Sequence, residues 1–379
     1  MIIPPYCSSK KDDIYLRLLN FSRITPHLKN DPYPEESQKG VVEALYSFSK
    51  SVNPAIRPFL PLIYHNTCQS GLRDKLHPEI QKILKDNTLW LIAAEMQNQH
   101  WLSKNLETFQ KEKIPVILLK GAAFAGSLYP ENAPRLGVDL DLLVTSDNFE
   151  PACSLLCRTM DQVLLSSDRV ATHETLFERV FLSKKGKGPT VEIHRGLTNP
   201  SIFNIDEKSL WDGSRKHPAY NSELVRILSP EDTLLHLAVH AFRDLDFCTH
   251  NILDAHEIWC QWEPDVEKLV ERADQWGARK VLFYLLANCR TIMGTPVPDT
   301  LLDSLRPSVA INKINEKILR STILDDPGHN PLRYRLIQIA SQITFPDYII
   351  RGIKFQFSYA RTRMNDWIIS RKSKQQSAA

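Results

Sequence analysis

The sequence lacks most of the features that would place it in a specialised class of protein. Its seven cysteines are scattered, odd in number and form no C-x-x-C pair, which argues against a disulfide framework or a thiolate zinc site. No apolar run is long enough to span a bilayer, and the N-terminal residues contain no stretch of signal-peptide length. The net charge of +3 is too small to indicate nucleic acid binding by itself. We therefore expect a cytoplasmic protein in a reducing compartment, without a membrane partner.

What is present is the composition of an ordinary globular protein, 42% hydrophobic and 24% charged over 379 residues. Residues 1–112 carry apolar residues at helical intervals, and the helical period returns after residue 229. Between these two regions, the sequence pattern changes to short apolar runs separated by turns. We predict an α/β (α+β) protein, in which a small mixed-sheet core at 113–205 is flanked by helical regions at 1–112 and 206–379.

The predicted core contains about four strands. The run IPVILLK (114–120) ends at a glycine, and VDLDLLV (138–144) is a second strand. Two further candidates, HETLFERVFLS and TVEIHRGL, are separated by the glycine-rich turn KKGKGP. We expect a short helix over 122–129 that Pro130 ends.

Two aspartates share one face of the second strand. Because side chains alternate along a strand, Asp139 and Asp141 point to one side and their apolar neighbours to the other. Neighbouring carboxylates repel and need a cation, and Mg²⁺ binds oxygen ligands of this kind. Glu192 in a later strand is a candidate third acid. The pair also fits a solvated sheet face, or ion pairs with Arg135 and Lys120, and D-x-D alone does not decide.

A later helix, SPEDTLLHLAVHAFRD, carries a second group of polar side chains. Asp232, His236 and His240 recur every four residues and so share one face. An H-x-x-x-H pair suggests zinc, but this pair lacks the glutamate of H-E-x-x-H and a third ligand at convincing spacing. A histidine-rich interface between domains is the other interpretation.

These segments together resemble a known family. VILLKGAAFAGSLYP, R-x-x-x-D-L-D-L-L-V, VEIHR and SPEDTLLHLAVHAFRDLDF…LDAHEIW are similar to the bacterial family of uncharacterised nucleotidyltransferases, of the polymerase-β-like superfamily. The resemblance covers roughly residues 75–350. One departure is the turn after the first strand, which reads Lys120-Gly121-Ala122 where the wider superfamily usually has Gly-Ser.

The resemblance implies roles for individual residues. Asp139, Asp141 and Glu192 would be the catalytic residues and would hold Mg²⁺, with Mn²⁺ as an alternative, and Glu192 would be either a metal ligand or a general base. The nucleotide-binding residues would be Lys120, Gly121, Ala122, Arg135, His194, Asp232, His236 and His240. His194 would also line the acceptor pocket, and Asp254 would stand near the same cleft.

The implied activity is transfer of a nucleoside monophosphate from ATP or GTP to a small-molecule or peptide acceptor. One alternative is a non-catalytic nucleotide-binding protein on the same fold, against which the intact acids argue. Another is a nucleic-acid enzyme such as a tRNA-end nucleotidyltransferase. The basic, aromatic stretch at 333–374 would serve that function, but it equally fits an amphipathic helix pair with solvated basic residues.

Overall fold

The structure is a computed structural model of the whole chain. The residues that it describes are 10–24, 35–50, 54–135, 137, 139–163, 177–184, 188–244, 250–324, 331–357 and 360–361. Cys68, Cys153, Cys157, Cys260 and Cys289 lie in these ranges and are free thiols, as their scattered spacing predicts. In the described part of the chain, no helix is both long and apolar enough to cross a membrane.

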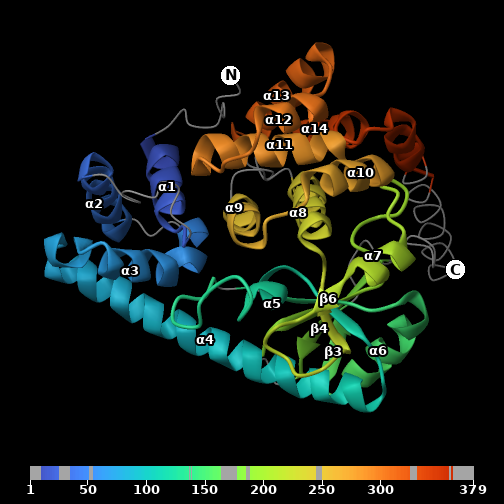
Figure 1. Cartoon of the computed structure of the whole chain (residues 1–379), viewed down its shortest axis with the longest axis horizontal. Coiled ribbons are helices and arrows are strands. Elements are labelled where there is room, and N and C mark those ends of the chain that lie inside the picture. The colour runs from blue at the N-terminus through green and yellow to red at the C-terminus, as the bar shows by residue number, and fades with distance from the viewer. Residues whose placement is uncertain are drawn as a thin grey trace, which may run out of the picture.

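The N-terminal region is helical, as predicted. Its elements are α1 (Lys10–Phe21), α2 (Glu35–Lys50), the 3-10 helix η1 (Pro54–Phe59), α3 (Leu60–Gln69), the 3-10 helix η2 (Leu72–Lys75) and α4 (Pro78–Lys111). Helix α4 starts with Pro78 at its first position, and the His77 side chain accepts a hydrogen bond from the Glu79 N–H. Its 34 residues span about 50 Å and run beneath both the other N-terminal helices and the sheet (Figure 1).

A single seven-stranded mixed sheet forms the centre of the molecule, in the order β3-β4-β5-β2-β1-β7-β6. Its strands are β1 (Val116–Leu118), β2 (Asp139–Leu143), β3 (Met160–Val163), β4 (Glu178–Ser183), β5 (Thr190–His194), β6 (Arg215–Lys216) and β7 (Val225–Ile227). Strand β2 pairs antiparallel with β1 and parallel with β5, and β5 pairs antiparallel with β4. The four predicted strands are therefore present, and β6 and β7 join them from beyond residue 205.

Short helices connect the strands. They are α5 (Lys120–Phe124), the 3-10 helix η3 (Ser146–Asn148), α6 (Phe149–Leu156) and α7 (Glu207–Gly213). The helix predicted over 122–129 is wrong in its bounds, because Gly126 adopts a left-handed φ of 68° that a helix cannot continue through. Residues 185–187, at the tip of the predicted β4–β5 turn, lie outside the described residues.

The C-terminal helices cover the sheet face opposite α4 (Figure 1). They are α8 (Pro230–Asp244), α9 (His250–Trp262), α10 (Val266–Trp276), α11 (Arg279–Asn288), the π-helix η4 (Cys289–Met293), α12 (Asp299–Leu305), α13 (Val309–Leu324) and α14 (Pro331–Thr344). Helix α8 begins as the Ser-Pro-Glu-Asp signature predicts, with the Ser229 hydroxyl accepting a hydrogen bond from the Asp232 N–H at 3.1 Å. It follows β7 directly and packs against α9, α10 and α11.

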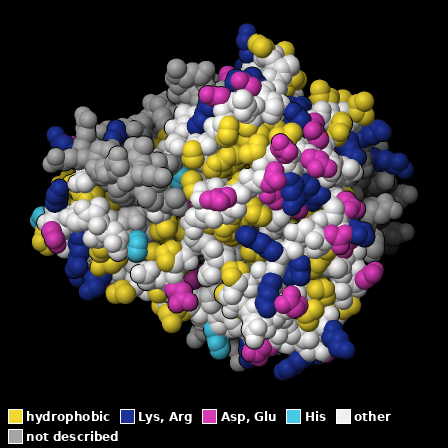
Figure 2. Space-filling model, viewed as in Figure 1, with side chains coloured by type: hydrophobic (Ala, Val, Ile, Leu, Met, Phe, Trp, Pro, Cys, Tyr) yellow, Lys and Arg dark blue, Asp and Glu magenta, His cyan; other side chains and the backbone are white. Residues whose placement is uncertain are grey.

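The basic C-terminal stretch is helical where it is described, over α14 and residues 349–357. Arg335, Lys354 and Arg361 are exposed there. On the face shown in Figure 2, basic and acidic side chains are interspersed. The described part thus matches an amphipathic helix pair with solvated basic residues.

Candidate metal and nucleotide site

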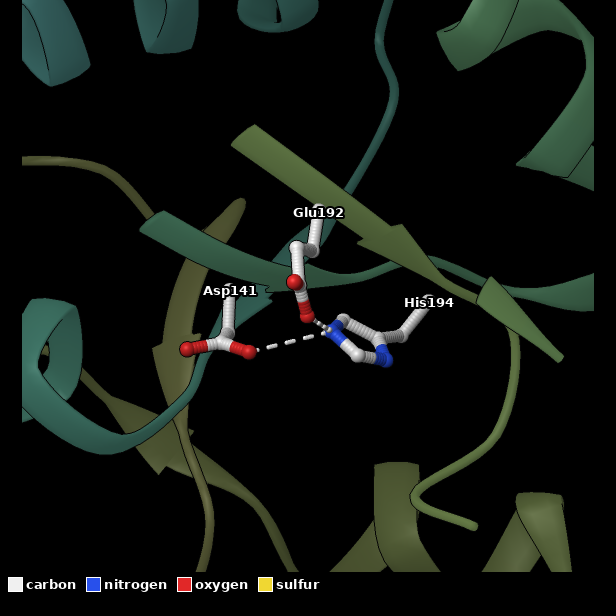
Figure 3. Close-up of side chains that lie close together, drawn as sticks. All are labelled: Asp141, Glu192 and His194. Atoms are coloured by element: carbon white, nitrogen blue, oxygen red, sulfur yellow. Dashed lines mark hydrogen bonds and ion pairs between the residues drawn. The ribbon is translucent and has the colours of Figure 1, made fainter. Parts of the chain in front are cut away.

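The pairing of β2 with β5 brings the acids together. In this parallel pair Asp141 lies opposite Glu192, and Asp139 lies opposite Thr190. Side chains at equal positions on adjacent strands share a face and lie close together. Asp141, Glu192 and His194 therefore converge, and their ligand atoms all lie within 4.8 Å of one another (Figure 3).

The imidazole of His194 lies between the two carboxylates. Its Nε2 is 3.2 Å from Oδ1 of Asp141 and 3.4 Å from Oε2 of Glu192 (Figure 3). Burial opposes the charged ring, but the hydrogen bonds to Asp141 and Glu192 raise the pKa of His194 to about 9. The ring is then an imidazolium at neutral pH, and its charge offsets part of the carboxylate charge.

Lys120 supplies a second cation. Its Nζ donates a hydrogen bond to Oδ1 of Asp141 at 2.9 Å, and both side chains are largely buried. Burial alone would raise the pKa of Asp141, but the Lys120 ammonium and the His194 hydrogen bond hold it well below its usual range. The ion pair between Lys120 and Asp141 is the alternative that the sequence left open, and it forms inside the acid cluster.

The backbone at Lys120 is held in an unusual conformation. Lys120 has a left-handed φ of 47°, which costs a residue with a side chain about 1 kcal/mol or more. Gly121 follows, and a Cβ there would lie 3.1 Å from the Cα of Gly137. The Lys-Gly pair therefore suits a tight turn in which two backbone segments approach each other. The buried Ala122 continues this turn into α5.

Asp139 lies at the edge of the cluster. It is half-buried at the start of β2, and burial, followed by the charges of Glu192 and Asp141, raises its pKa. Because side chains alternate along a strand, Asp139 shares a face of the sheet with Asp141. The compact set of three ligands, however, contains His194 in its place.

Helix α8 turns two histidines toward the cluster. His236 is buried, and burial, followed by the positive charge of Lys120, holds the pKa of His236 and of His240 well below the usual range. The two rings are in edge-to-face contact, with centroids 6.4 Å apart. The fold thus favours the neutral form of both rings, on the helix face that the sequence predicted to lie near the nucleotide.

The structure gives Asp232 a different environment from its helical neighbours. Its carboxylate is 2% exposed and forms a two-pronged ion pair with Arg272 of α10, at 2.7 Å and 2.9 Å. The same guanidinium donates to the Ser209 hydroxyl of α7. Asp232 therefore joins three helices, and its place beside the nucleotide stays a prediction.

Arg135 connects the sheet domain with α9. Its Nη2 lies 2.7 Å from Oδ2 of Asp254, which is fully buried and also accepts a hydrogen bond from the Tyr129 hydroxyl at 2.7 Å. The Arg135 Nη1 would lie 3.4 Å from a Cβ at Gly121, and its buried Nε has no hydrogen-bond partner among the described residues. Arg135 thus retains donors beside the Lys120–Gly121 turn.

Arg135 also lines a cavity of about 450 Å³. Its other walls include Met96 and Gln99 of α4 and Tyr220. The volume is that of a small-molecule pocket. Arg135 therefore links the tight turn with a space large enough for part of a substrate.

A family model decides the class of protein. The model described as an uncharacterised nucleotidyltransferase matches residues 59–294, more than half of the chain. The chain belongs to this nucleotidyltransferase family. The matched span starts in the η1 helix and ends after the π-helix η4, so the family unit includes α4 and the helices packed on the sheet. No curated protein and no solved structure matches the chain.

Family membership makes the protein an enzyme that transfers a phosphorus-containing group, on a mixed α/β core flanked by helices. The cluster of Asp141, Glu192 and His194 is its candidate metal site. Sequence reasoning missed Glu178, Arg243 and Tyr129, each of which contacts a predicted site residue. Only the pairing of β4 with β5, which places Glu178 opposite His194, would have revealed the first of them.

Proposed function

We propose that the protein transfers a nucleoside monophosphate from a nucleoside triphosphate to a hydroxyl or phosphate group of a small-molecule or peptide acceptor. The observation that carries this proposal is the in-register pairing of Asp141 with Glu192 on the sheet of a nucleotidyltransferase. The buried carboxylate of Asp141 and the half-buried carboxylate of Glu192 lie opposite each other there, beside a lysine at a tight turn. This is the arrangement that a metal–triphosphate complex requires.

The donor set fits a divalent metal. Two carboxylates and one imidazole within 4.8 Å offer three ligand atoms to one cation, and Asp139 lies two residues before Asp141 on the same strand. When bound, Mg²⁺ or Mn²⁺ would offset the charge that builds on the leaving pyrophosphate. Asp139, Asp141 and Glu192 are the residues that we propose to hold it.

The bond changes follow from the reaction class. An acceptor oxygen attacks the α-phosphorus, the bond from that phosphorus to the α–β bridging oxygen breaks, and pyrophosphate leaves. A hydroxyl acceptor gives up its proton during the attack, and Glu192, whose carboxylate is half-buried at the cluster, would either accept that proton or act as a metal ligand. Lys120 and Arg135 bind phosphate oxygens, and the neutral rings of His236 and His240 face the nucleotide.

Thermal melting with MgATP and MgGTP tests the metal and nucleotide assignment. Nucleotide should stabilise the wild type, and Asp139→Ala or Asp141→Ala should abolish that shift. Asp161→Asn is the matched control, because Asp161 is an exposed aspartate on the edge strand β3. Metal-dependent binding that survives both alanine substitutions would show the assignment to be wrong.

Turnover tests whether Glu192 takes part in proton transfer. Glu192→Gln should leave most of the nucleotide-induced shift in place while suppressing release of pyrophosphate. Chelation of divalent metal should stop the reaction in the wild type. Full activity in the presence of a chelator would refute the mechanism.

A further inference from the structure

His194 has the surroundings of a metal ligand and not only of a bridging ion pair. Its Nε2 faces both Asp141 and Glu192, and its ring is 3% exposed. The three ligand atoms come from two adjacent strands whose register is set by five paired positions. An imidazole nitrogen is therefore built into the centre of the carboxylate cluster.

A third carboxylate lies on the other side of the His194 ring. Glu178 lies opposite His194 in the β4–β5 pair, and its Oε2 is 3.6 Å from the His194 Nδ1. Arg243 of α8 in turn lies 3.4 Å from Glu178 and contacts the Nε2 of His240. At 3.6 Å the contact between Glu178 and His194 is an ion pair and not a hydrogen bond, and Nδ1 has no hydrogen-bond partner among the described residues. Histidines that bind metals usually have their second nitrogen oriented by a carboxylate, and Glu178 is placed to do this for His194.

We propose that His194 is a nitrogen ligand of the cation held by Asp141 and Glu192, and that the site selects a divalent transition metal such as Mn²⁺ over Mg²⁺. This inference rests on the proposed function, because both place a divalent cation at these carboxylates. Coordination would replace the proton that Nε2 otherwise shares with the two acids. Glu178 is then a positioning residue for the ligand.

Ligand chemistry gives the direction of the selectivity. Mg²⁺ prefers oxygen donors and keeps several waters, whereas imidazole nitrogen suits first-row transition ions. Two carboxylates with one imidazole still suit Mn²⁺, which accepts both kinds of donor. A site of carboxylates alone would gain far less from exchanging Mg²⁺ for Mn²⁺.

Electron paramagnetic resonance of the full-length protein with Mn²⁺ alone tests the proposal directly. Pulsed spectra of the wild type should show modulation from a coordinated imidazole nitrogen, and displacement of Mn²⁺ should require at least a tenfold excess of Mg²⁺. A spectrum without nitrogen modulation would overturn the proposal, even if Mn²⁺ binds. This measurement needs no variant and so does not depend on how substitutions fold.

Two variants and a control complete the test. His194→Gln should remove the nitrogen modulation and reduce the ratio of Mn²⁺ to Mg²⁺ affinity at least tenfold. Glu178→Gln should weaken Mn²⁺ binding about 10-fold, which is the lower end of the effect expected for a residue that orients a metal ligand. His217→Gln removes a buried imidazole that is hydrogen-bonded to the Ala123 carbonyl. It should leave the nitrogen modulation and the Mn²⁺ affinity unchanged.

The outcomes separate this inference from the proposed function. An unchanged affinity ratio in His194→Gln overturns the inference, while loss of metal binding in Asp141→Ala still supports the proposed function. A wild type that binds neither ion, alone or with nucleotide, overturns both.

Discussion

The Nζ of Lys120 lies 2.9 Å from Oδ1 of Asp141, so a lysine at the candidate phosphate-binding turn is paired with the central acid of the candidate metal site. The two side chains are 14% and 6% exposed, and Asp141 is 4% exposed as a whole residue. Water therefore screens this pair only weakly. Any cation that binds Asp141 must share or replace the contact with Lys120.

Replacing Lys120 with methionine should destabilise the protein and increase the stabilisation that metal confers. Loss of Lys120 leaves the buried Asp141 carboxylate with His194 as a remaining cationic partner, so the cost should stay below that of an unpaired buried charge, which is about 3–5 kcal/mol. A divalent ion can supply the missing charge, so the melting temperature of Lys120→Met should rise more with Mn²⁺ or Mg²⁺ than that of the wild type. Melting with and without metal measures both effects.

Lys120→Gly is the matched control for the backbone. Glycine adopts the left-handed φ of 47° without strain, so this variant should be more stable than Lys120→Met by about 1 kcal/mol while responding to metal in the same way. Equal metal-induced shifts in the wild type and both variants would contradict the competition between Lys120 and the metal.

Asp232 should prove to be a structural residue. Because its carboxylate is bound by Arg272 through two hydrogen bonds, Asp232→Asn should lower stability by about 3–5 kcal/mol and leave nucleotide affinity within a few-fold of wild type. A double-mutant cycle with Arg272→Met, followed by urea unfolding, measures the coupling. A stable Asp232→Asn variant with lost nucleotide binding would instead return Asp232 to the nucleotide site.

Much of the fold could be predicted because its signals are local. Alternation in VDLDLLV and TVEIHRGL identified β2 and β5, and the Ser-Pro-Glu-Asp signature identified the start of α8. Strands β6 and β7 contain two and three residues, too few for any period, and β3 is a short edge strand with exposed polar residues. These strands are defined by their pairing with neighbouring strands and not by a pattern in their own residues.

The sequence could identify the candidate site residues, but it could not show which of them contact one another. Alternation puts Asp139 with Asp141 and Glu192 with His194, yet the parallel register that sets Asp141 opposite Glu192 is a property of the assembled sheet. The same holds for Arg135, whose partner Asp254 lies far along the chain on α9. Contacts between distant segments leave no periodic signal.

His217 should make stability depend on pH. It is fully buried, its Nε2 lies 3.1 Å from the Ala123 carbonyl, and its Nδ1 accepts from the Ala219 N–H. Burial lowers the pKa of His217 from 6.5 to about 4, so the fold favours the neutral ring. This contribution to stability is complete above pH 6.5 and is lost as the pH falls toward 4.

The expected loss from His217 between pH 7.5 and pH 5 is about 2 kcal/mol. Urea unfolding at the two values, for the wild type and for His217→Gln, isolates it from other histidines that titrate with the same sign. The variant should lose about 2 kcal/mol less than the wild type over this range. Equal losses would mean that the ring is already solvated in the fold.

Arg135 should prove to serve both the fold and the nucleotide. Its pairing with Asp254 is buried, so Arg135→Met and Asp254→Leu should each destabilise by about 3–5 kcal/mol, whereas the double variant should recover much of the loss because no charge is left unpaired. Its Nη1 also lies beside the Lys120–Gly121 turn, where phosphate oxygens are proposed to bind. The double variant should therefore fold but bind nucleoside triphosphate at least tenfold more weakly.

Nucleoside monophosphate provides the internal control for this prediction, since its affinity should change little when a contact to the outer phosphates is lost. Tyr129→Phe removes only the hydrogen bond to Asp254 and should cost about 1–3 kcal/mol of stability without a change in triphosphate affinity. Calorimetric titration of the folded variants with both nucleotides gives the comparison. If the double variant binds triphosphate as tightly as the wild type, Arg135 acts solely as the connection between the sheet and α9.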